Sequence, residues 1–247
     1  MADDAFTLHG NLPLYERVAI LDAARHGDCA LLPADAPYRF ASAAPLIAVT
    51  IDEFDRAALD YPILFFAAER EAVIVTGLTA DRNLFVAPDG HYAPGAYVPA
   101  YLRRHPFTLA RREGQDGNVI CIDEASERLV PLGTPGAVPL FERGRPSDVV
   151  REAIGVCNAV DAAETRTRAF VAMLDDLGLL EPRQAYHSPP GGARMLVVEY
   201  DSVSRAKLDA LDPPAFARLR QGGALAAIYA HLLSAGNWDV LPLWAAG

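Results

Sequence analysis

The segment PLGTPGAVPLFERGRPSDVVREAIGVC, residues 131–157, is where the character of this chain changes. Its first part contains four prolines and three glycines, a composition typical of a linker or an extended strap. Ser147 can then cap a helix, and Val150, Ile154 and Cys157 recur at the spacing of one helical face. The segment therefore predicts a strand-rich part before it and a helix-rich part after it.

The residues before this segment are typical of short strands. Ile63–Ala68 and Ala72–Thr76 are apolar runs separated by three charged residues, which predicts a hairpin. Thr50–Glu53 has the pattern of a capping box, and it predicts a short helix that ends at Tyr61 and Pro62. Further predicted strands are Leu14–Leu21, Leu46–Val49, Asn83–Ala87 and Asn118–Ile122, the third closed by a turn at Pro88–Gly90.

The residues after the segment are mostly helical in pattern. A second apolar helical face ends at Gly178, a residue suited to a helix C-cap. Met195–Tyr200 is a late strand, and Tyr186–Gly192 before it reads as a connector or as a lid over a groove. Asp212 and the prolines after it predict a helix start, and Gly222–Gly223 separates that helix from the last one.

This order of elements decides the fold class. Strands first and helices last argue for an α+β fold with a mainly antiparallel sheet, rather than a wound parallel sheet. We predict a single domain over residues 1–247, with an alternative division into two lobes. The lobes would be a strand-rich one at about 12–140 and a helix-rich one at about 147–238.

Composition narrows the possible partners and compartment. The chain is 51% hydrophobic with a formal net charge of -10, so it can bury a core and is repelled by nucleic acid and anionic membranes. The acidic start has no secretory pattern, and no apolar run approaches a membrane span. The three cysteines are far apart, which is typical of reduced, separate thiols. We therefore expect a soluble cytoplasmic protein.

The segment Asp81–Arg112, DRNLFVAPDGHYAPGAYVPAYLRRHPFTLARR, concentrates aromatic residues, prolines and a basic pair in an acidic chain. Two guanidinium groups beside an imidazole and two tyrosines can clamp a carboxylate or phosphate and stack on the group that carries it. The alternative is a solvated or ion-paired basic face, which is the commoner outcome for such pairs. The candidate ligand- or partner-binding residues are Tyr97, Tyr101, Arg103, Arg104 and His105.

Motifs of common enzymes do not occur in the sequence. It contains no GxSxG, GxGxxG or P-loop pattern, and no HExxH metal motif. The six histidines are scattered along the chain. We therefore predict no catalytic residue, no metal site and no cofactor, and we lean away from an enzyme.

Several blocks of the chain resemble the SapC-like family of bacterial proteins, and their order makes chance similarity an inadequate explanation. The most specific block is NLFVAPDG at 83–90 followed by AYVPAYLRRHPF at 96–107. VVEYDSVSRAKL at 197–208 departs from the family pattern. The other matching blocks are LPLYERV (12–18), DYPILF (60–65), CIDE (121–124), TRAFVAMLDDLGLLEP (167–182), AKLDAL (206–211) and GALAAIYAHLLSAGNW (223–238).

The resemblance implies a physiological setting and little chemistry. The family takes its name from a surface-layer connection, and related proteins occur in loci with TonB-dependent receptors, halogenase-like proteins and cupin-like oxygenases. A peptide-transport permease that shares the name is a different protein. The resemblance favours a non-enzymatic accessory or binding protein that recognises a protein partner or a small anionic ligand. The alternatives are an enzyme with a composite site for a small anionic substrate, and a helper of a halogenase-like or oxygenase-like partner.

Overall fold

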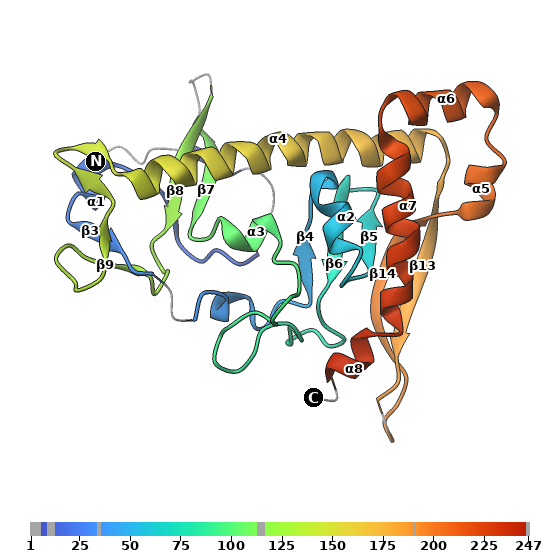
Figure 1. The fold of residues 1–247 in the computed structure, drawn as a ribbon, viewed down its shortest axis with the longest axis horizontal. Helices are drawn as coiled ribbons and strands as arrows, with labels where there is room; N and C mark the ends of the chain where they lie inside the picture. Colours follow the sequence, from blue (N-terminus) through green and yellow to red (C-terminus); the bar gives the residue numbers. More distant parts are fainter. Residues whose placement is uncertain (1–5, 9–12, 34–35, 113–116, 190, 246–247) are drawn as a thin grey trace. The chain divides into compact units, whose positions relative to one another are not determined.

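The computed structural model describes residues 6–8, 13–33, 36–112, 117–189 and 191–245 (Figure 1). Every strand pair in it is antiparallel, and helices are enriched toward the C-terminus, which confirms the predicted α+β class. The chain divides into two compact units. Unit 1 comprises residues 1–37 and 102–161, and unit 2 comprises residues 38–101 and 162–247. The single domain and the two lobes contiguous in sequence stay predictions.

Unit 1 is built on small antiparallel sheets. A four-stranded sheet has the order β1 (Phe6–Leu8), β7 (Phe107–Arg112), β8 (Asn118–Asp123) and β2 (Val18–Ile20). A three-stranded sheet has the order β10 (Val138–Pro139), β3 (Cys29–Leu31) and β9 (Leu129–Pro131). A short pair joins β11 (Phe141–Glu142) to β12 (Arg145–Pro146), and helix α1 is Ala23–His26. Residues 131–146 are therefore an extended, sheet-forming strap and not a linker.

Apolar side chains from these sheets and from helix α4 (Asp148–Asp176) form the core of unit 1. Val150 and Cys157 are fully buried and Ile154 packs beside them, so the predicted helical face is confirmed. The helix begins directly after Ser147, at the predicted place. The buried cluster consists of Leu21, Leu31, Phe107, Leu109, Ile122, Leu140, Val150 and Cys157.

Unit 2 contains a five-stranded sheet with the order β13 (Leu180–His187), β14 (Met195–Val203), β5 (Ile63–Phe66), β6 (Glu71–Val75) and β4 (Leu46–Ala48). The predicted hairpin is confirmed, since β5 and β6 pair from Ile63↔Ile74 to Phe66↔Glu71. Strand β13 was not expected, and it includes Tyr186, which the sequence placed in a loop.

The predicted strand at Asn83–Ala87 is wrong. These residues form turns with one isolated bridge, Val86↔Tyr92. The physical reason is local, because the side-chain oxygen of Asn83 accepts the N–H of Phe85 at 3.0 Å. Such a side-chain bond competes with strand pairing and favours a turn.

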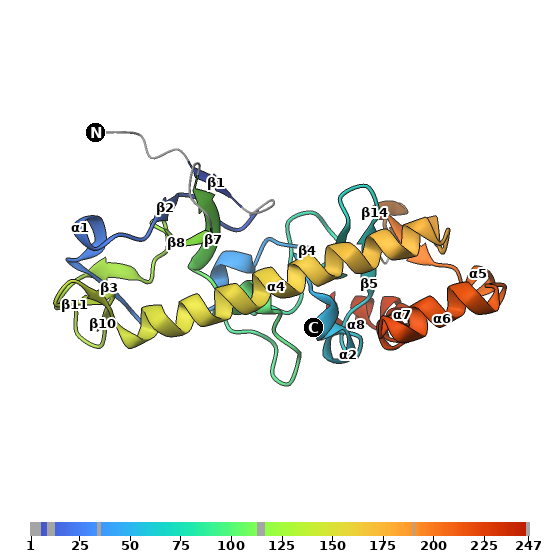
Figure 2. The ribbon, with the colours of Figure 1, turned by 90° about the horizontal axis from the view of Figure 1, so that it is seen from above.

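The helices of unit 2 follow the predicted capping signals. Asp212 accepts the N–H of Ala215 at 2.7 Å, and Gly223 has a φ of 69° at the break before the next helix. Helix α2 lies beside α7 in both views (Figures 1 and 2). No helix within the described ranges is long and apolar enough to cross a membrane. The helices are η1 (Arg39–Ala41), η2 (Ile51–Glu53), α2 (Phe54–Ala57), α3 (Ala100–Arg103), α5 (Arg205–Asp209), α6 (Pro213–Gln221), α7 (Ala224–Ser234), η3 (Ala235–Trp238) and α8 (Leu241–Ala245), of which α3 extends into unit 1.

His231 of α7 fastens this helix to the sheet. Its Nδ1 lies 2.9 Å from the carbonyl oxygen of Ile63, and its Nε2 lies 3.1 Å from the N–H of Val203. The two contacts together require a neutral ring with the proton on Nδ1. Burial lowers the pKa of His231 to about 4, so the ring is neutral at pH 7.

This arrangement predicts that stability falls in mild acid. As the pH falls from 6.5 toward about 4, the unfolded chain binds a proton that folded His231 does not. At about pH 5 the loss is about 2 kcal/mol of the free energy of unfolding, from the two pKa values. We expect His231→Gln to show a correspondingly flatter dependence of unfolding on pH in denaturant titrations.

The matched control is His91→Gln, because the side chain of His91 is 60% exposed. That variant should keep the acid sensitivity of the parent. Equal pH dependence in His231→Gln and the parent would show that the ring is not held neutral.

Candidate functional site

The structure divides the five candidate residues between the two units. Tyr97 and Tyr101 belong to unit 2, whereas Arg103, Arg104 and His105 belong to unit 1. Tyr101, Arg104 and His105 are buried, with 5%, 6% and 7% of their surface exposed, and Arg103 is exposed. A joint role of the five residues in binding stays a prediction, and Arg103 is the member of the basic pair that solvent reaches.

His105 is a neutral buried residue. Burial lowers its pKa to about 4, although the nearby carboxylate of Asp123 opposes this shift. Its Nε2 lies 3.8 Å from Oδ2 of Asp123, and this contact is not an ion pair at pH 7 because the ring is uncharged. The ring also packs against Tyr15, with centroids 5.2 Å apart.

The carboxylate of Asp123 accepts hydrogen bonds from backbone N–H groups. Burial raises the pKa of its carboxyl, but hydrogen bonds from backbone N–H groups outweigh this, and the pKa lies below its usual value. The donors are the N–H groups of Glu16, Arg17 and Ala125, at 3.0, 2.9 and 3.0 Å. The carboxylate therefore anchors the segment before β2 to the end of β8.

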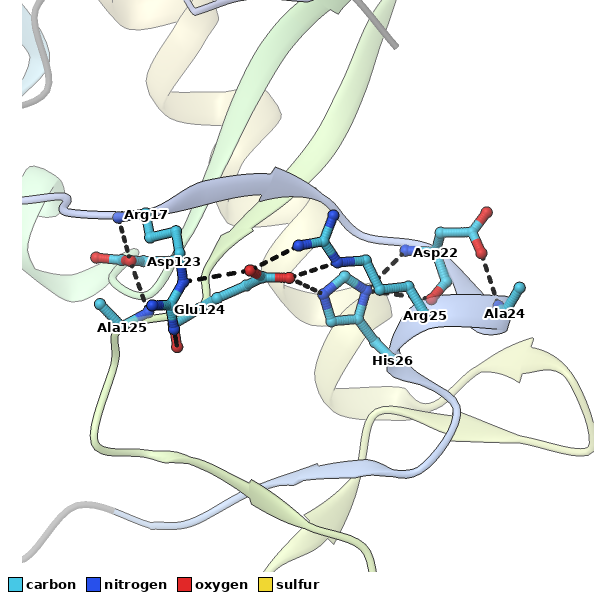
Figure 3. A network of polar contacts seen from close by, with 8 residues as sticks. All are labelled: Arg17, Asp22, Ala24, Arg25, His26, Asp123, Glu124 and Ala125. Atoms are coloured by element: carbon cyan, nitrogen blue, oxygen red, sulfur yellow. Dashed lines mark hydrogen bonds and ion pairs between the residues drawn. The ribbon is translucent and has the colours of Figure 1, made fainter. Parts of the chain in front are cut away.

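The neighbouring Glu124 takes part in a network of polar contacts in unit 1, drawn in Figure 3. Its carboxylate forms ion pairs with two arginines: one oxygen lies 2.6 Å from Nε of Arg25, and the other lies 3.3 Å from Nε of Arg17. Its Oε1 also lies 3.2 Å from Nε2 of His26, a ring that is 2% exposed. The second ring nitrogen of His26 is 3.2 Å from both the N–H and the carbonyl oxygen of Asp22.

A histidine bonded to a carboxylate invites comparison with a nucleophilic site, and Cys29 follows His26 closely in sequence. An active thiol needs a lowered pKa. Burial, with Asp28 and Glu124, instead raises the pKa of Cys29. The geometry and electrostatics thus fit a clamp that holds α1 against β8, rather than an activated nucleophile.

Unit 2 contains an open groove that sequence reasoning missed. Its volume is about 540 Å³, within the range of small-molecule sites. Phe85 is fully buried beside it, and its ring centroid lies 4.7 Å from that of Trp244. The groove is lined by Arg82, Asn83, Leu84, Val86, Ala87, Pro88, Leu243 and Trp244.

One wall of this groove comes from the block at residues 83–90, which carries the most specific resemblance to the SapC-like family. The other wall comes from α8, near the C-terminus. No spacing rule connects the two segments, so the sequence offered no signal for the groove. The predicted turn at Pro88–Gly90 is present, with the N–H of His91 donating to Asp89 at 3.0 Å and Gly90 at a φ of 88°. Over the described ranges, no group of three or more His, Cys, Asp or Glu residues could hold a metal ion.

Tyr97 bonds to the buried carboxylate of Glu53. Its hydroxyl donates to Oε1 of Glu53 at 2.8 Å, and the N–H of Ala100 donates to the same oxygen at 2.7 Å. The other oxygen of Glu53 receives the N–H and the hydroxyl of Thr50, at 2.9 and 2.7 Å. The predicted capping box is therefore present, and its carboxylate also fixes the segment that contains Tyr97.

We predict that Glu53→Gln lowers the free energy of unfolding by about 2–4 kcal/mol, because an amide cannot accept all the buried donors. Asp52→Asn is the matched control, since Asp52 pairs with Arg166 at the surface and surface pairs contribute under about 1 kcal/mol. Chemical denaturation of both variants measures the difference. Equal losses in the two variants would contradict the central role of Glu53.

Comparison with known proteins gives one positive result. The family model of SapC matches residues 21–241, which is most of the chain. Neither the curated proteins nor the solved structures contain a match. The match extends over both compact units and includes the groove-lining block. The chain therefore belongs to the SapC family.

Proposed function

We propose that this SapC-family protein is a non-enzymatic binding protein that recognises a protein partner in the cytoplasm. Following the setting that the family resemblance suggests, it would serve envelope or TonB-dependent nutrient-uptake physiology. The observation that carries the proposal is an exposed apolar surface on unit 2. Its two main members are Leu59, which is 70% exposed, and Leu233, which is 78% exposed.

We propose that these two leucines belong to one surface, which we call the Leu59–Leu233 patch, because α2 lies beside α7 (Figures 1 and 2). Nδ2 of Asn237 donates to the carbonyl oxygen of Ala58 at 2.8 Å, which places η3 beside the residue before Leu59. Leu233 lies near the end of α7, directly before η3. Tyr229, one turn further back, is 42% exposed. Large apolar side chains that remain exposed together are typical of protein interaction sites.

The polar residues of the chain support binding rather than catalysis. The carboxylates of Glu53 and Asp123 and the ring of His231 are each occupied by backbone donors or acceptors that hold the fold. A general acid or base must instead have its reactive atom within reach of a substrate. These groups therefore carry structural bonds that hold the fold.

The proposed compartment is supported by the cysteines. Cys29, Cys121 and Cys157 are all free thiols. Burial and the nearby Cys157 raise the pKa of Cys121 to about 12, so the thiol of Cys121 stays protonated at pH 7. Free, unreactive thiols are typical of reducing compartments.

Among the candidate residues at 97–105, Arg103 is the exposed one that we propose for partner binding. Tyr101, Arg104 and His105 are buried, so a partner that docks on this chain as it stands would reach Arg103 first. Arginine is enriched at interface hot spots because its planar group bonds and stacks at once. We therefore propose Arg103 as a second contact residue.

The test is affinity capture from the native host with the tagged protein and a Leu59→Asp/Leu233→Asp double variant. We expect a reproducible partner whose affinity falls about 30-fold or more in the variant, the effect of a lost hot spot of about 2 kcal/mol. Arg103→Ala should weaken capture of the same partner.

Leu132→Asp is the matched control, since Leu132 is 49% exposed and lies in unit 1. It should retain the partner. Capture that is unaffected by the double variant, or lost equally in the control, would overturn the proposed surface.

A further inference from the structure

The groove lined by Arg82–Pro88, Leu243 and Trp244 contains a buried hydrogen-bond donor with no acceptor. Asn83 lines the groove but is only 2% exposed, so it belongs to the inner wall. Its Oδ1 accepts the N–H of Phe85 at 3.0 Å, which assigns the orientation of the amide. Its Nδ2 then makes no hydrogen bond to any residue that the structure describes. An unsatisfied buried donor destabilises the fold, so one that is retained suits a role in binding an acceptor.

The backbone holds this donor firmly. The N–H of Asn83 donates to the carbonyl oxygen of Ser42 at 2.7 Å, and the N–H of Leu84 donates to that of Thr76 at 2.7 Å. Gly77 packs so closely that a Cβ atom there would lie 1.9 Å from the carbonyl oxygen of Arg82. These contacts fix the backbone at Asn83, and the bond from the N–H of Phe85 holds the oxygen of its side-chain amide.

Arg82, the residue before Asn83, brings a positive charge to the same groove. Arg82 lines the same groove and is exposed, and its guanidinium makes no ion pair or side-chain hydrogen bond within the described ranges. A guanidinium group binds the two oxygens of a carboxylate in one plane. The lining of the groove thus includes one cation, and the neutral N–H donor of Asn83 lies covered in its wall.

The rest of the groove is apolar. Leu84, Val86, Pro88 and Leu243 contribute aliphatic surface, and Trp244 contributes an indole ring that is 38% exposed. The indole packs against the buried ring of Phe85, which fixes one side of it and leaves the remainder available to a ligand. A ligand that fits must therefore have an apolar body attached to its charged end.

We propose that this groove binds a small organic carboxylate with an apolar body. The carboxylate oxygens accept from the guanidinium of Arg82 and, once the side chain that covers it moves aside, from Nδ2 of Asn83, which has no accessible surface in this structure. The body packs on Leu243 and Trp244. One cation and one amide donor match the single charge and two oxygens of a carboxylate, whereas a phosphate dianion would require more donors. This site goes beyond the proposed partner surface and uses different residues.

The experiment follows the indole N–H signal of Trp244 by NMR, assigned with Trp244→Phe, during titration with 3-phenylpropanoate, octanoate and a dipeptide blocked at its N-terminus. The neutral amide of 3-phenylpropanoate is the matched ligand control. We expect saturable binding of at least one acid and about tenfold weaker binding of the amide, because the amide lacks the charge that Arg82 recognises. Tighter binding of the dipeptide would identify a peptide C-terminus as the source of the carboxylate, and tighter binding of the other acids a free acid.

Two variants locate the site. Arg82→Gln changes an exposed side chain and should abolish the preference for the acid over the amide. Asn83→Asp keeps an oxygen for the N–H of Phe85 but replaces the donor with a negative charge, so it should weaken acid binding further. Arg220→Gln, an exposed arginine on α6, should change nothing.

The outcomes separate this site from the partner surface. No saturable shift of Trp244 up to about 10 mM of any acid, or equal binding of acid and amide, would overturn the carboxylate site. An unchanged preference in Arg82→Gln would do the same. None of these results bears on capture by the Leu59–Leu233 patch, which is measured with other variants.

Discussion

The fold of unit 2 depends on one buried carboxylate. Glu53 receives four hydrogen bonds, two from Thr50 and two from the segment that includes Tyr97 and Ala100. A buried charge is tolerated only when its lone pairs are satisfied, so these donors must be in place together. The capping box alone would explain the glutamate at a helix start, but the two distant donors make it a tertiary contact. The turn-rich segment between β6 and α3 is thereby held at its far end, and that segment supplies one wall of the groove.

The same rule governs the other buried polar groups. Asp123 accepts three backbone N–H groups, and His231 joins α7 to β5 and β14 through both ring nitrogens. Each of these residue types is a common acid or base in enzymes. Here each one instead makes hydrogen bonds that join segments distant in sequence. Polar residues in this chain therefore substitute for a larger apolar core at places where short elements meet. Buried networks of this kind specify one arrangement because partial satisfaction is costly.

The sequence predicted what local chemistry determines. The capping box at Thr50–Glu53, the hairpin of β5 and β6, and the helix start at Asp212 all depend on residues close in the chain, and each is confirmed. The strand expected at Asn83–Ala87 failed because a side chain–backbone bond from Phe85 to Asn83 outcompeted the apolar pattern. The groove could not be predicted, because its walls come from residues 82–88 and 243–244 and meet only in the folded chain. The binding role of the basic pair is still a prediction, since sequence spacing does not report burial and Arg104 is buried.

What remains unsatisfied is as informative as what is satisfied. Most buried polar groups in native proteins have partners, and neighbouring exposed apolar side chains often mark interaction sites. Two exceptions in unit 2 are the amide nitrogen of Asn83, in the groove that Arg82 also lines, and the exposed side chains of Leu59 and Leu233. Neither contributes to the interactions that hold the fold. Local departures from good packing tend to coincide with function, because a ligand or partner supplies the missing contact. The two exceptions differ in chemistry, a polar donor in the wall of a groove and a set of exposed apolar side chains, and so the two proposed sites would bind different partners.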